Sequence, residues 1–380
     1  MTRSIFFLII LFSSLGISLK SYSQLIKIGL HTQKTFNQVY LKADYGDYSL
    51  TNGKEELMEF LEGEAGEFKW TESGIEFYYA NQYFGKLKAF YFTGKEVDNF
   101  FKLRLRNPQS EVFTYDDNVI LKHTPDGILI INEIDLDDYL AGVMEAEIGK
   151  LANVEFLKTL AIITRTYTLQ NIGRFSTEGY DLCDHTACQM YLGKNRFNDS
   201  IKVAVDSTSG QVIVDNENDL IEAVYHSNSG GHTANAEDVW NSSKRYSYLK
   251  GARDPYGADM DHACWEMQIR RQDWIKFLEL KGNPNPKDIC LTVNDGSNKF
   301  LSCNDFKIPL TEVRSYFGLN STIFDSYASD GMYVMVGKGF GHRVGLSQEG
   351  AFHMGKLGFT HIDIINHYYQ GVKIISMEKL

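Results

Sequence analysis

Two glutamates, Glu145 and Glu147, stand two residues apart in the otherwise mostly apolar stretch AGVMEAEIGK (141–150). If this stretch is helical, Glu147 falls on the apolar face and Glu145 lies nearer the polar side. A carboxyl group in apolar surroundings has its charged form disfavoured, so its pKa rises and it can donate a proton near neutral pH. The pattern makes Glu147 a candidate general acid, and by itself it supports the structural alternative equally. The alternative is a structural glutamate paired with an arginine, for which Arg165 is the candidate.

Two glycine-containing segments offer polar side chains for binding a ligand. The first, VYHSNSGGHTANAEDVW (224–240), is a predicted strand that enters a loop rich in Ser, Gly and His, and it has no G-x-S-x-G elbow of a serine hydrolase. The second, GKGFGHRVGLSQEGA (337–351), precedes a predicted helix with Ser347 as N-cap and does not match a phosphate-binding G-x-x-x-x-G-K-[ST] loop. Such loops fit a neutral polymer such as a glycan better than a nucleotide.

A third segment, YDLCDHTACQMYLG (180–193), groups Cys183, His185 and Cys188, which are zinc ligands by residue type. A fourth ligand would have to come from elsewhere in the chain, with His226, His262 and Cys264 as the candidates. The competing interpretation is a local disulfide. The H-E-x-x-H pattern of zinc proteases is absent from the sequence.

The first 23 residues have the pattern of a secretory signal peptide. Arg3 supplies the positive charge, residues 5–12 form an unbroken apolar run, and Ser21 and Ser23 give a small-x-small cleavage pattern. The apolar run is shorter than the roughly 20 residues that a membrane span needs. The sequence therefore predicts cleavage after residue 23 and an exported protein, periplasmic or extracellular, with no stable membrane span.

The cysteine and charge content agree with such a compartment. Export permits disulfides, and Cys290 and Cys303 flank a turn-rich stretch that they would bridge as a hairpin. The formal net charge is −11, and removal of residues 1–23 with Arg3 and Lys20 changes it to −11 − 2 = −13. An acidic chain of this kind has no nucleic-acid footprint.

The hydrophobic patterns predict an α+β fold in which one long central helix packs against sheets. Residues 25–135 are predicted as mostly short strands, with a short helix at 54–62. The other predicted elements are a helix capped by Asp135 or Asp137 and ended by Gly149, a buried helix at 153–171, a helix at 195–207, strand structure at 211–228 and helices within 345–370.

Taken together and in this order, these segments resemble the SpoIID/LytB family of bacterial cell-wall proteins. The resemblance rests on DYLAGVMEAEIGK, EFLKTLAIITRTYTL, YDLCDHTACQMYLG, AVDSTSGQVI and the two glycine-containing segments, and it covers most of residues 112–375. It implies a signal peptide at 1–23, an N-terminal β-rich part at 24–111 and a catalytic domain at 112–375. The poorly matching segment at about 250–330 is then an insertion or subdomain.

The resemblance implies peptidoglycan as substrate and a lytic transglycosylase as activity, acting on glycan strands without stem peptides and requiring no cofactor. The family's catalytic glutamate falls on Glu147, followed here by Ile-Gly where Met-Pro is usual. The implied glycan contacts are Arg165, Tyr167, Gln189, Tyr191, His226, Ser227, Ser229, His342 and Gln348. Zinc at Cys183, His185 and Cys188 would be an optional addition.

The sequence is also compatible with two other functions. Another branch of the family is named for stimulating a cell-wall amidase, so the chain is alternatively a non-catalytic glycan-binding enhancer with such an amidase as partner. A metal-dependent cell-wall hydrolase that uses the Cys/His/Asp cluster is the third hypothesis.

Overall fold

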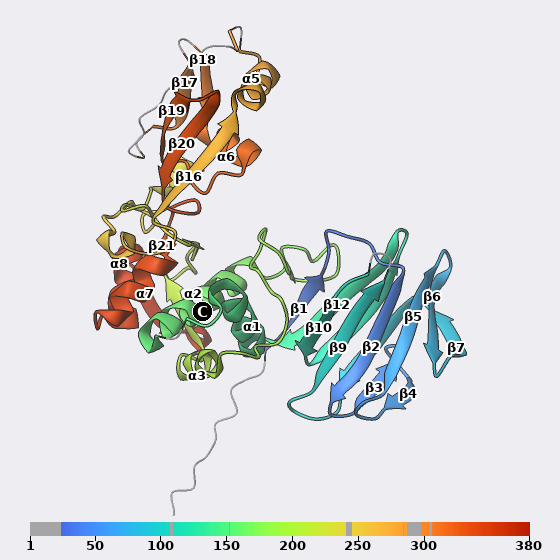
Figure 1. The fold of residues 1–380 in the computed structure, drawn as a ribbon. Helices are drawn as coiled ribbons and strands as arrows, with labels where there is room; N and C mark the ends of the chain where they lie inside the picture. The colour runs from blue at the N-terminus through green and yellow to red at the C-terminus, as the bar shows by residue number, and fades with distance from the viewer. Residues whose placement is uncertain are drawn as a thin grey trace, which may run out of the picture.

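The computed structural model describes residues 24–106, 109–151, 153–240, 245–283, 285–286, 296, 298–303 and 306–380. The predicted signal peptide lies outside these residues. Three parts follow one another in space: a β-sandwich at the N-terminus, a helical centre, and a smaller subdomain that projects from the centre (Figure 1). None of the described helices is both long enough and apolar enough to cross a membrane.

The β-sandwich consists of two sheets formed mainly by the first third of the chain, and all their strand pairs are antiparallel except the short parallel pair of β1 and β13. The seven-stranded sheet has the order β13-β1-β12-β11-β8-β3-β4, and the six-stranded sheet has the order β10-β9-β2-β5-β6-β7. Alternation explains the packing, because Val39, Leu41 and Ala43 of β2 face the core while the residues between them face outward. The strands are β1 Leu25–Leu30, β2 Gln38–Tyr45, β3 Tyr48–Thr51, β4 Glu56–Phe60, β5 Ala65–Thr71, β6 Gly74–Tyr79, β7 Gln82–Leu87, β8 Ala89–Gly94, β9 Phe100–Arg106, β10 Val112–Asp116, β11 Asn118–Thr124, β12 Gly127–Asp135 and β13 Leu182–Cys183.

The predicted short helix at 54–62 is wrong. Residues Glu56–Phe60 form strand β4, which pairs with β3 and places Phe60 in the sandwich core. Glu, Leu and Met favour a helix locally, but backbone pairing with β3 and burial of Phe60 outweigh that preference of a few tenths of a kcal/mol per residue.

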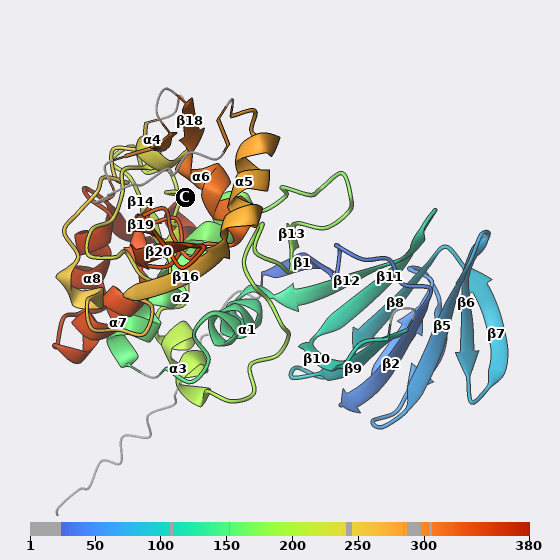
Figure 2. The same cartoon turned by 45° about the horizontal axis from the view of Figure 1, so that its top comes forward.

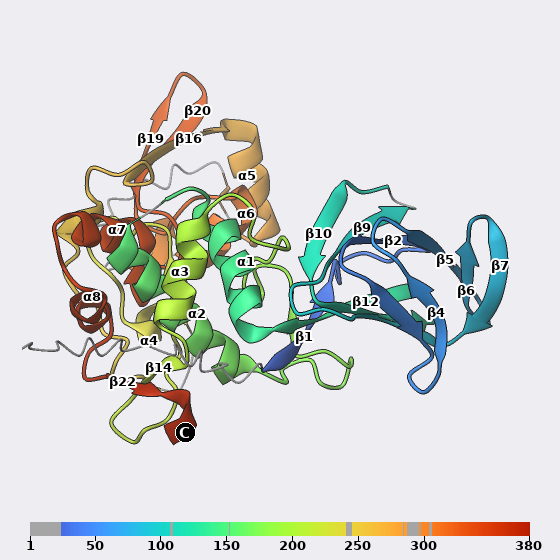
Figure 3. The same cartoon turned by 90° about the horizontal axis from the view of Figure 1, so that it is seen from below.

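The helical centre surrounds α2, whose apolar residues are buried on most sides (Figure 3). Helices α1, α3, α7 and α8 and strand β14 contact α2. The α+β class is therefore confirmed, but the neighbours of the central helix are mostly helices rather than the large sheets. The elements of this part are α1 Leu136–Ile148, α2 Val154–Asn171, α3 Asp199–Ser207, β14 Gln211–Val214, β15 Tyr225–His226, α4 Ala236–Val239, η1 Pro255–Gly257, β21 Leu346–Ser347, α7 Gln348–Lys356, α8 His361–Tyr368, β22 Lys373–Ser376 and η2 Met377–Lys379.

Local signals define the ends of these helices. Asp135 caps α1 by accepting the N–H of Asp137, and the backbone turns away at Gly149 with φ 57°. Asn153 and Ser347 cap α2 and α7 in the same way. These predicted boundaries are confirmed. Helix α3 begins four residues later than predicted, at Asp199, and strand structure in 211–228 is limited to β14 and β15.

The junction between the sandwich and the centre has no linker. Strand β12 ends at Asp135 and α1 begins at Leu136 (Figure 2). Asp117 of the sandwich accepts the N–H of Asp135 at 2.7 Å, and the carbonyl of Gln24 accepts the N–H of Leu136 at 2.9 Å. The first turn of α1 is therefore fixed to the sheet.

The smaller subdomain has a hydrophobic core of its own. Trp274 lies at its centre, stacked on Tyr333 with ring centroids 4.3 Å apart and packed against Phe277. A separate core is what allows this part to extend away from the helical centre. Its elements are β16 Cys264–Arg270, α5 Arg271–Leu280, β17 Phe300–Cys303, β18 Phe306–Pro309, α6 Leu310–Phe317, β19 Phe324–Ser329 and β20 Met332–Lys338.

Candidate active site

Glu147 occupies the last turn of α1, with its side chain half-buried in the helical centre. The N–H of Met190 donates to Oε1 of Glu147 at 3.3 Å, and the side chains of Tyr225 and Gln348 also face the carboxyl group. Three segments that are far apart in sequence thus meet at this one side chain. They are the segments singled out from the sequence.

Burial raises the pKa of Glu147 above its ordinary value. The contacts with Met190, Gln348 and Tyr225 act in the opposite direction, because each stabilises the charged form. Since burial outweighs these contacts, the carboxyl group keeps its proton to a higher pH than an exposed glutamate would. This is the property that the helical pattern predicted for Glu147.

Glu145 has a different role. Its carboxylate accepts the backbone N–H groups of Arg196 at 2.9 Å and Phe197 at 2.7 Å, just before α3. It therefore ties α1 to the chain segment that leads into α3. The helical phase separated the two glutamates correctly, and both of the Glu145 oxygens are occupied by the protein itself.

The two glycine-containing segments meet at strands β15 and β21. These strands run parallel, with Tyr225 opposite Leu346 and His226 opposite Ser347, so Gln348 follows directly at the start of α7. We call this pairing of β15 with β21, together with the loops beside it, the strand crossing, and glycine is required at two positions there. A Cβ atom at Gly341 would lie 2.6 Å from Cβ of His226, and one at Gly345, where φ is +69°, would overlap the carbonyl of Val224.

Two histidines lie next to this crossing with their rings 5.5 Å apart. Burial lowers the pKa of His226 well below its usual value, and burial together with Arg314 lowers the pKa of His342 to about 4. Both rings are therefore neutral at neutral pH and can offer a hydrogen bond but no charge. Nδ1 of His226 faces the carbonyl of Val344 at 3.2 Å.

The buried Nε2 of His226, one residue after Tyr225, has no hydrogen-bond partner among the described residues. An unpaired buried polar group costs about 1–3 kcal/mol, so it is normally satisfied by water or by a ligand. Nε2 of His226 is therefore available to a polar ligand that binds beside the β15–β21 pairing.

The other residues near the site that were predicted to contact glycan differ in their burial and in their hydrogen-bond partners. Tyr167 is half-buried, and burial raises its pKa to about 12. The side chain of Gln189 donates to Thr168 at 2.9 Å, which fixes its orientation. Ser227 is half-buried, and its carbonyl accepts the N–H of Glu349 at 3.0 Å.

Arg165, Tyr191 and Ser229 are bonded within the protein and do not face the site. The Arg165 side chain is 0% exposed and binds Asp137 at 2.8 Å, not Glu147, so the structural pairing considered for Glu147 is wrong. The Tyr191 hydroxyl is buried and donates to Asn132 at 3.0 Å. Ser229 is buried and donates to Asp254 at 2.7 Å. Their predicted contacts with a glycan give way to structural roles, because each polar group already has a protein partner.

The cysteine cluster is arranged as a pair of thiols rather than as a metal site. The sulfurs of Cys183 and Cys188 lie 2.6 Å apart and are both buried. Nδ1 of His185 instead accepts the N–H of Ala187 at 3.3 Å. Within the described part of the chain, no three His, Cys, Asp or Glu side chains are grouped so that they could hold a metal. The predicted zinc ligands are therefore not gathered around a metal position here, and the disulfide between the two neighbouring free thiols stays a prediction.

The other cysteines lie in or beside the subdomain. Cys264 is a free, exposed thiol in β16. Cys303 is disulfide-bonded. The predicted hairpin bridge between Cys290 and Cys303 cannot be followed further because Cys290 lies outside the described residues.

Sequence reasoning missed Tyr225 and Tyr139. Tyr225 contacts the carboxyl group of Glu147, and its hydroxyl is so deeply buried that its pKa rises well above its usual value. Tyr139 lies two turns before Glu147 on α1 and faces Gln189. The position of Tyr225 directly before His226 was the one available signal, because adjacent residues in a very short strand both lie beside the crossing.

The chain is similar to several known proteins. The family model described as Stage II sporulation protein matches residues 124–214. Stage II sporulation protein D of Bacillus amyloliquefaciens is 29% identical over 261 residues, which are 64% of this chain and 75% of that protein. The protein of the same name from Bacillus subtilis (strain 168) is also 29% identical, over 270 residues and the same shares. The resemblance to the SpoIID/LytB family is confirmed.

The matched residues 124–214 include the helix that carries Glu147 and both thiols of the cysteine pair. An amidase enhancer of Bacillus subtilis (strain 168) is also similar. It is 26% identical over 291 residues, which are 62% of this chain and 40% of the enhancer. SpoIID/LytB relatives therefore carry names of two kinds, and the family alone does not decide between catalysis and enhancement.

Proposed function

We propose that this protein is a secreted peptidoglycan lytic transglycosylase that cleaves glycan strands lacking stem peptides. The observation that carries the proposal is the Glu147 carboxyl group, which is buried enough to have a raised pKa and faces polar groups of three segments that are distant in sequence. None of the described groups that shift the pKa of Glu147 is a second carboxylate. A glycoside hydrolase normally needs two carboxyl groups at the cleaved bond, whereas this reaction needs one.

The reaction uses Glu147 first as an acid and then as a base. The carboxylic acid donates its proton to the glycosidic oxygen as the bond from that oxygen to C1 of N-acetylmuramic acid breaks. The resulting carboxylate takes the proton of the C6 hydroxyl of the same sugar, and O6 bonds to C1. The products are a free hydroxyl on the released sugar and a 1,6-anhydro end, and no water is consumed.

The neighbours of Glu147 suit both steps. Burial favours the protonated form that the first step needs, and contacts from Met190, Gln348 and Tyr225 stabilise the carboxylate between the steps. The neutral side chains of His226 and His342 can bind sugar hydroxyl and amide groups without adding charge near the developing cation.

A non-catalytic glycan-binding enhancer of a cell-wall amidase is the alternative. The similarity to an amidase enhancer favours it. In that case the same side chains around Glu147 would bind glycan strands, and Glu147 would be a hydrogen-bonding group rather than a proton donor.

The test is product analysis after incubation of residues 24–380 with peptide-free glycan strands in heavy-oxygen water. Mass spectrometry is expected to find new ends lighter by one water than hydrolysis products and free of heavy oxygen. A chelator is expected to leave the rate unchanged. Ends that carry heavy oxygen would indicate a hydrolase, and chelator-sensitive cleavage would indicate a metal-dependent one. Intact strands that remain bound to the protein would favour the enhancer.

The pH dependence provides a second check on the acid. Tyr225 lowers the pKa of Glu147, so Tyr225→Phe should raise that pKa further. Because the acid must be protonated, activity falls as pH rises through this pKa. The falling limb of kcat/KM should therefore move to higher pH in Tyr225→Phe. Tyr79→Phe, which removes a similar Tyr–Glu contact with Glu64 in the sandwich, should leave the limb in place. A limb that moves to lower pH in Tyr225→Phe would contradict the assignment.

A further inference from the structure

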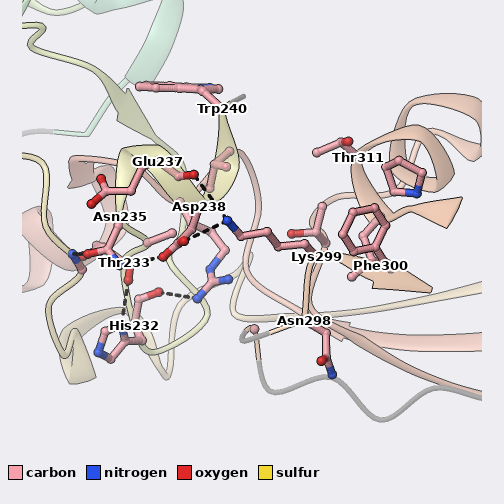
Figure 4. A pocket seen from close by; sticks show the side chains of 18 of the residues that line it. His232, Thr233, Asn235, Glu237, Asp238, Trp240, Asn298, Lys299, Phe300 and Thr311 are labelled. Atoms are coloured by element: carbon pink, nitrogen blue, oxygen red, sulfur yellow. Dashed lines mark hydrogen bonds and ion pairs between the residues drawn. The ribbon is translucent and has the colours of Figure 1, made fainter. Parts of the chain in front are cut away.

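A second pocket of ≈ 820 Å³ lies between the α4 segment and the subdomain (Figure 4). Asp238 and Trp240 line it from the α4 side. Lys299, Phe300 and Thr311 line it from the subdomain side. The subdomain is the part of the chain that matches the SpoIID/LytB pattern poorly, so this pocket is additional to the Glu147 site.

The charged groups of this pocket are largely balanced by their neighbours. Nζ of Lys299 lies 3.0 Å from Asp238, and Glu237 pairs with Lys250. Glu312, also in the lining, pairs with Lys281 outside it. Arg343, also in the lining, donates to the carbonyls of Ser229 and His232. Since each carboxylate has a cation beside it and the Arg343 side chain is held by these carbonyls, the pocket gives little attraction to a charged ligand. A neutral ligand fits this balance better.

The remaining lining offers aromatic faces and hydrogen-bonding groups. Trp240 and Phe300 line the pocket from different segments, with Asn235 on the side of Asp238 and Thr311 on the side of Phe300 (Figure 4). Oε2 of Glu237 is buried and has no hydrogen-bond partner in the described part of the chain. An uncharged ligand with apolar faces and hydroxyl donors satisfies both features, because its faces pack on the rings and a hydroxyl group pairs with the orphan oxygen. A sugar has this chemistry.

The pocket is connected to Glu147 by a row of rings. The ring of Trp240 lies 5.6 Å from that of His342, which lies 5.5 Å from that of His226. His226 follows Tyr225, whose side chain faces Glu147. These short ring-to-ring distances place the pocket within reach of a linear polymer that is bound at Glu147, although the buried His226 ring itself is not on the polymer's path.

We propose that this pocket is a saccharide subsite that holds a neutral sugar of the same glycan strand, remote from the bond that is cleaved. The subsite rests on the proposed function in that both require a glycan ligand. It makes binding depend on strand length, because short strands fill the Glu147 site alone and longer strands reach Trp240 and Phe300. The subdomain thereby selects strands long enough to span both places.

The test uses the Glu147→Gln protein, so that strands are bound but not cleaved. Calorimetry with size-fractionated peptide-free glycan should show tighter binding of long strands than of tetrasaccharides. Trp240→Ala and Phe300→Ala in this background should weaken long-strand binding about 10-fold and leave tetrasaccharide binding unchanged. Phe300 is 47% exposed, so its removal does not threaten folding. The control is Tyr327→Ala, a 46% exposed aromatic of the same subdomain that is not in the pocket lining.

Three results of these binding experiments would overturn the subsite. Long-strand binding that is unchanged in Phe300→Ala overturns the subsite, as does an equal loss for short and long strands. Absence of binding at every length in the Glu147→Gln parent also overturns it. The anhydro-end assay on the wild-type protein reports separately on the proposed function. Length-dependent binding without any cleavage would leave the subsite standing and reject the transglycosylase.

Discussion

Replacement of Glu147 by glutamine is expected to lower the rate of anhydro-end formation by about 10²- to 10⁴-fold, the usual contribution of a general acid–base group. Glutamine keeps the volume of the side chain and can still contact the N–H of Met190 through its carbonyl oxygen. It has no proton to give to the glycosidic oxygen and cannot take one from the C6 hydroxyl. The loss should therefore appear in kcat, with little change in binding of the strand.

Glu145→Gln is the matched control, because it makes the same change two residues away on the same helix. Glu145 contacts only the backbone N–H groups of Arg196 and Phe197 among the hydrogen bonds seen in the described structure. Its replacement should weaken the anchoring of the segment before α3 and keep the rate within a few-fold of wild type. Equal losses in the two variants, or an active Glu147→Gln protein, would reject Glu147 as the acid.

Replacement of Arg165 by methionine is expected to have the largest effect on stability, about 3–5 kcal/mol. The guanidinium is fully buried, binds Asp137 at 2.8 Å and donates to the carbonyls of Thr208 at 2.8 Å and Val205 at 3.3 Å. Methionine fills much of the space but leaves Asp137 and these carbonyls without their partner. Urea unfolding followed by far-ultraviolet circular dichroism measures the loss as a lower midpoint.

Lys202→Ala provides the comparison, because Lys202 also joins α3 to α1 through a carboxylate, that of Asp138. Its side chain is 47% exposed, so the pair is surrounded by water and should contribute no more than about 1 kcal/mol. A loss for Arg165→Met as small as that for Lys202→Ala would show that the buried Arg165–Asp137 pair does not hold α1, α2 and α3 together.

What could be predicted from the sequence was mostly local. The caps at Asp135 and Ser347 depend on a side chain and a backbone group two or three residues apart, so residue type and spacing are sufficient to find them. The distinction between Glu145 and Glu147 depends on helical period alone, which is equally local. These predictions agree with the structure because nothing distant competes with them.

The predictions that failed depend on partners far away in sequence. Strand β4 exists because β3 pairs with it, and α2 is surrounded by helices that come from both ends of the domain. Arg165 was assigned to the cleft because it lies in a shared motif, but its partner Asp137 lies 28 residues earlier in the chain, on another helix. Tyr225 escaped notice because only the pairing of β15 with β21 brings its segment to Glu147.

The direct passage from β12 into α1 has a mechanical consequence. With Asp117 and Gln24 holding the first residues of the helix, the sandwich and the base of α1 form one rigid lever, and Glu147 lies near its far end. Any torque on the sandwich is transmitted along the helix to the carboxyl group without a hinge to absorb it. An attachment made by the sandwich would therefore also set the angle at which the carboxyl group meets a strand under tension.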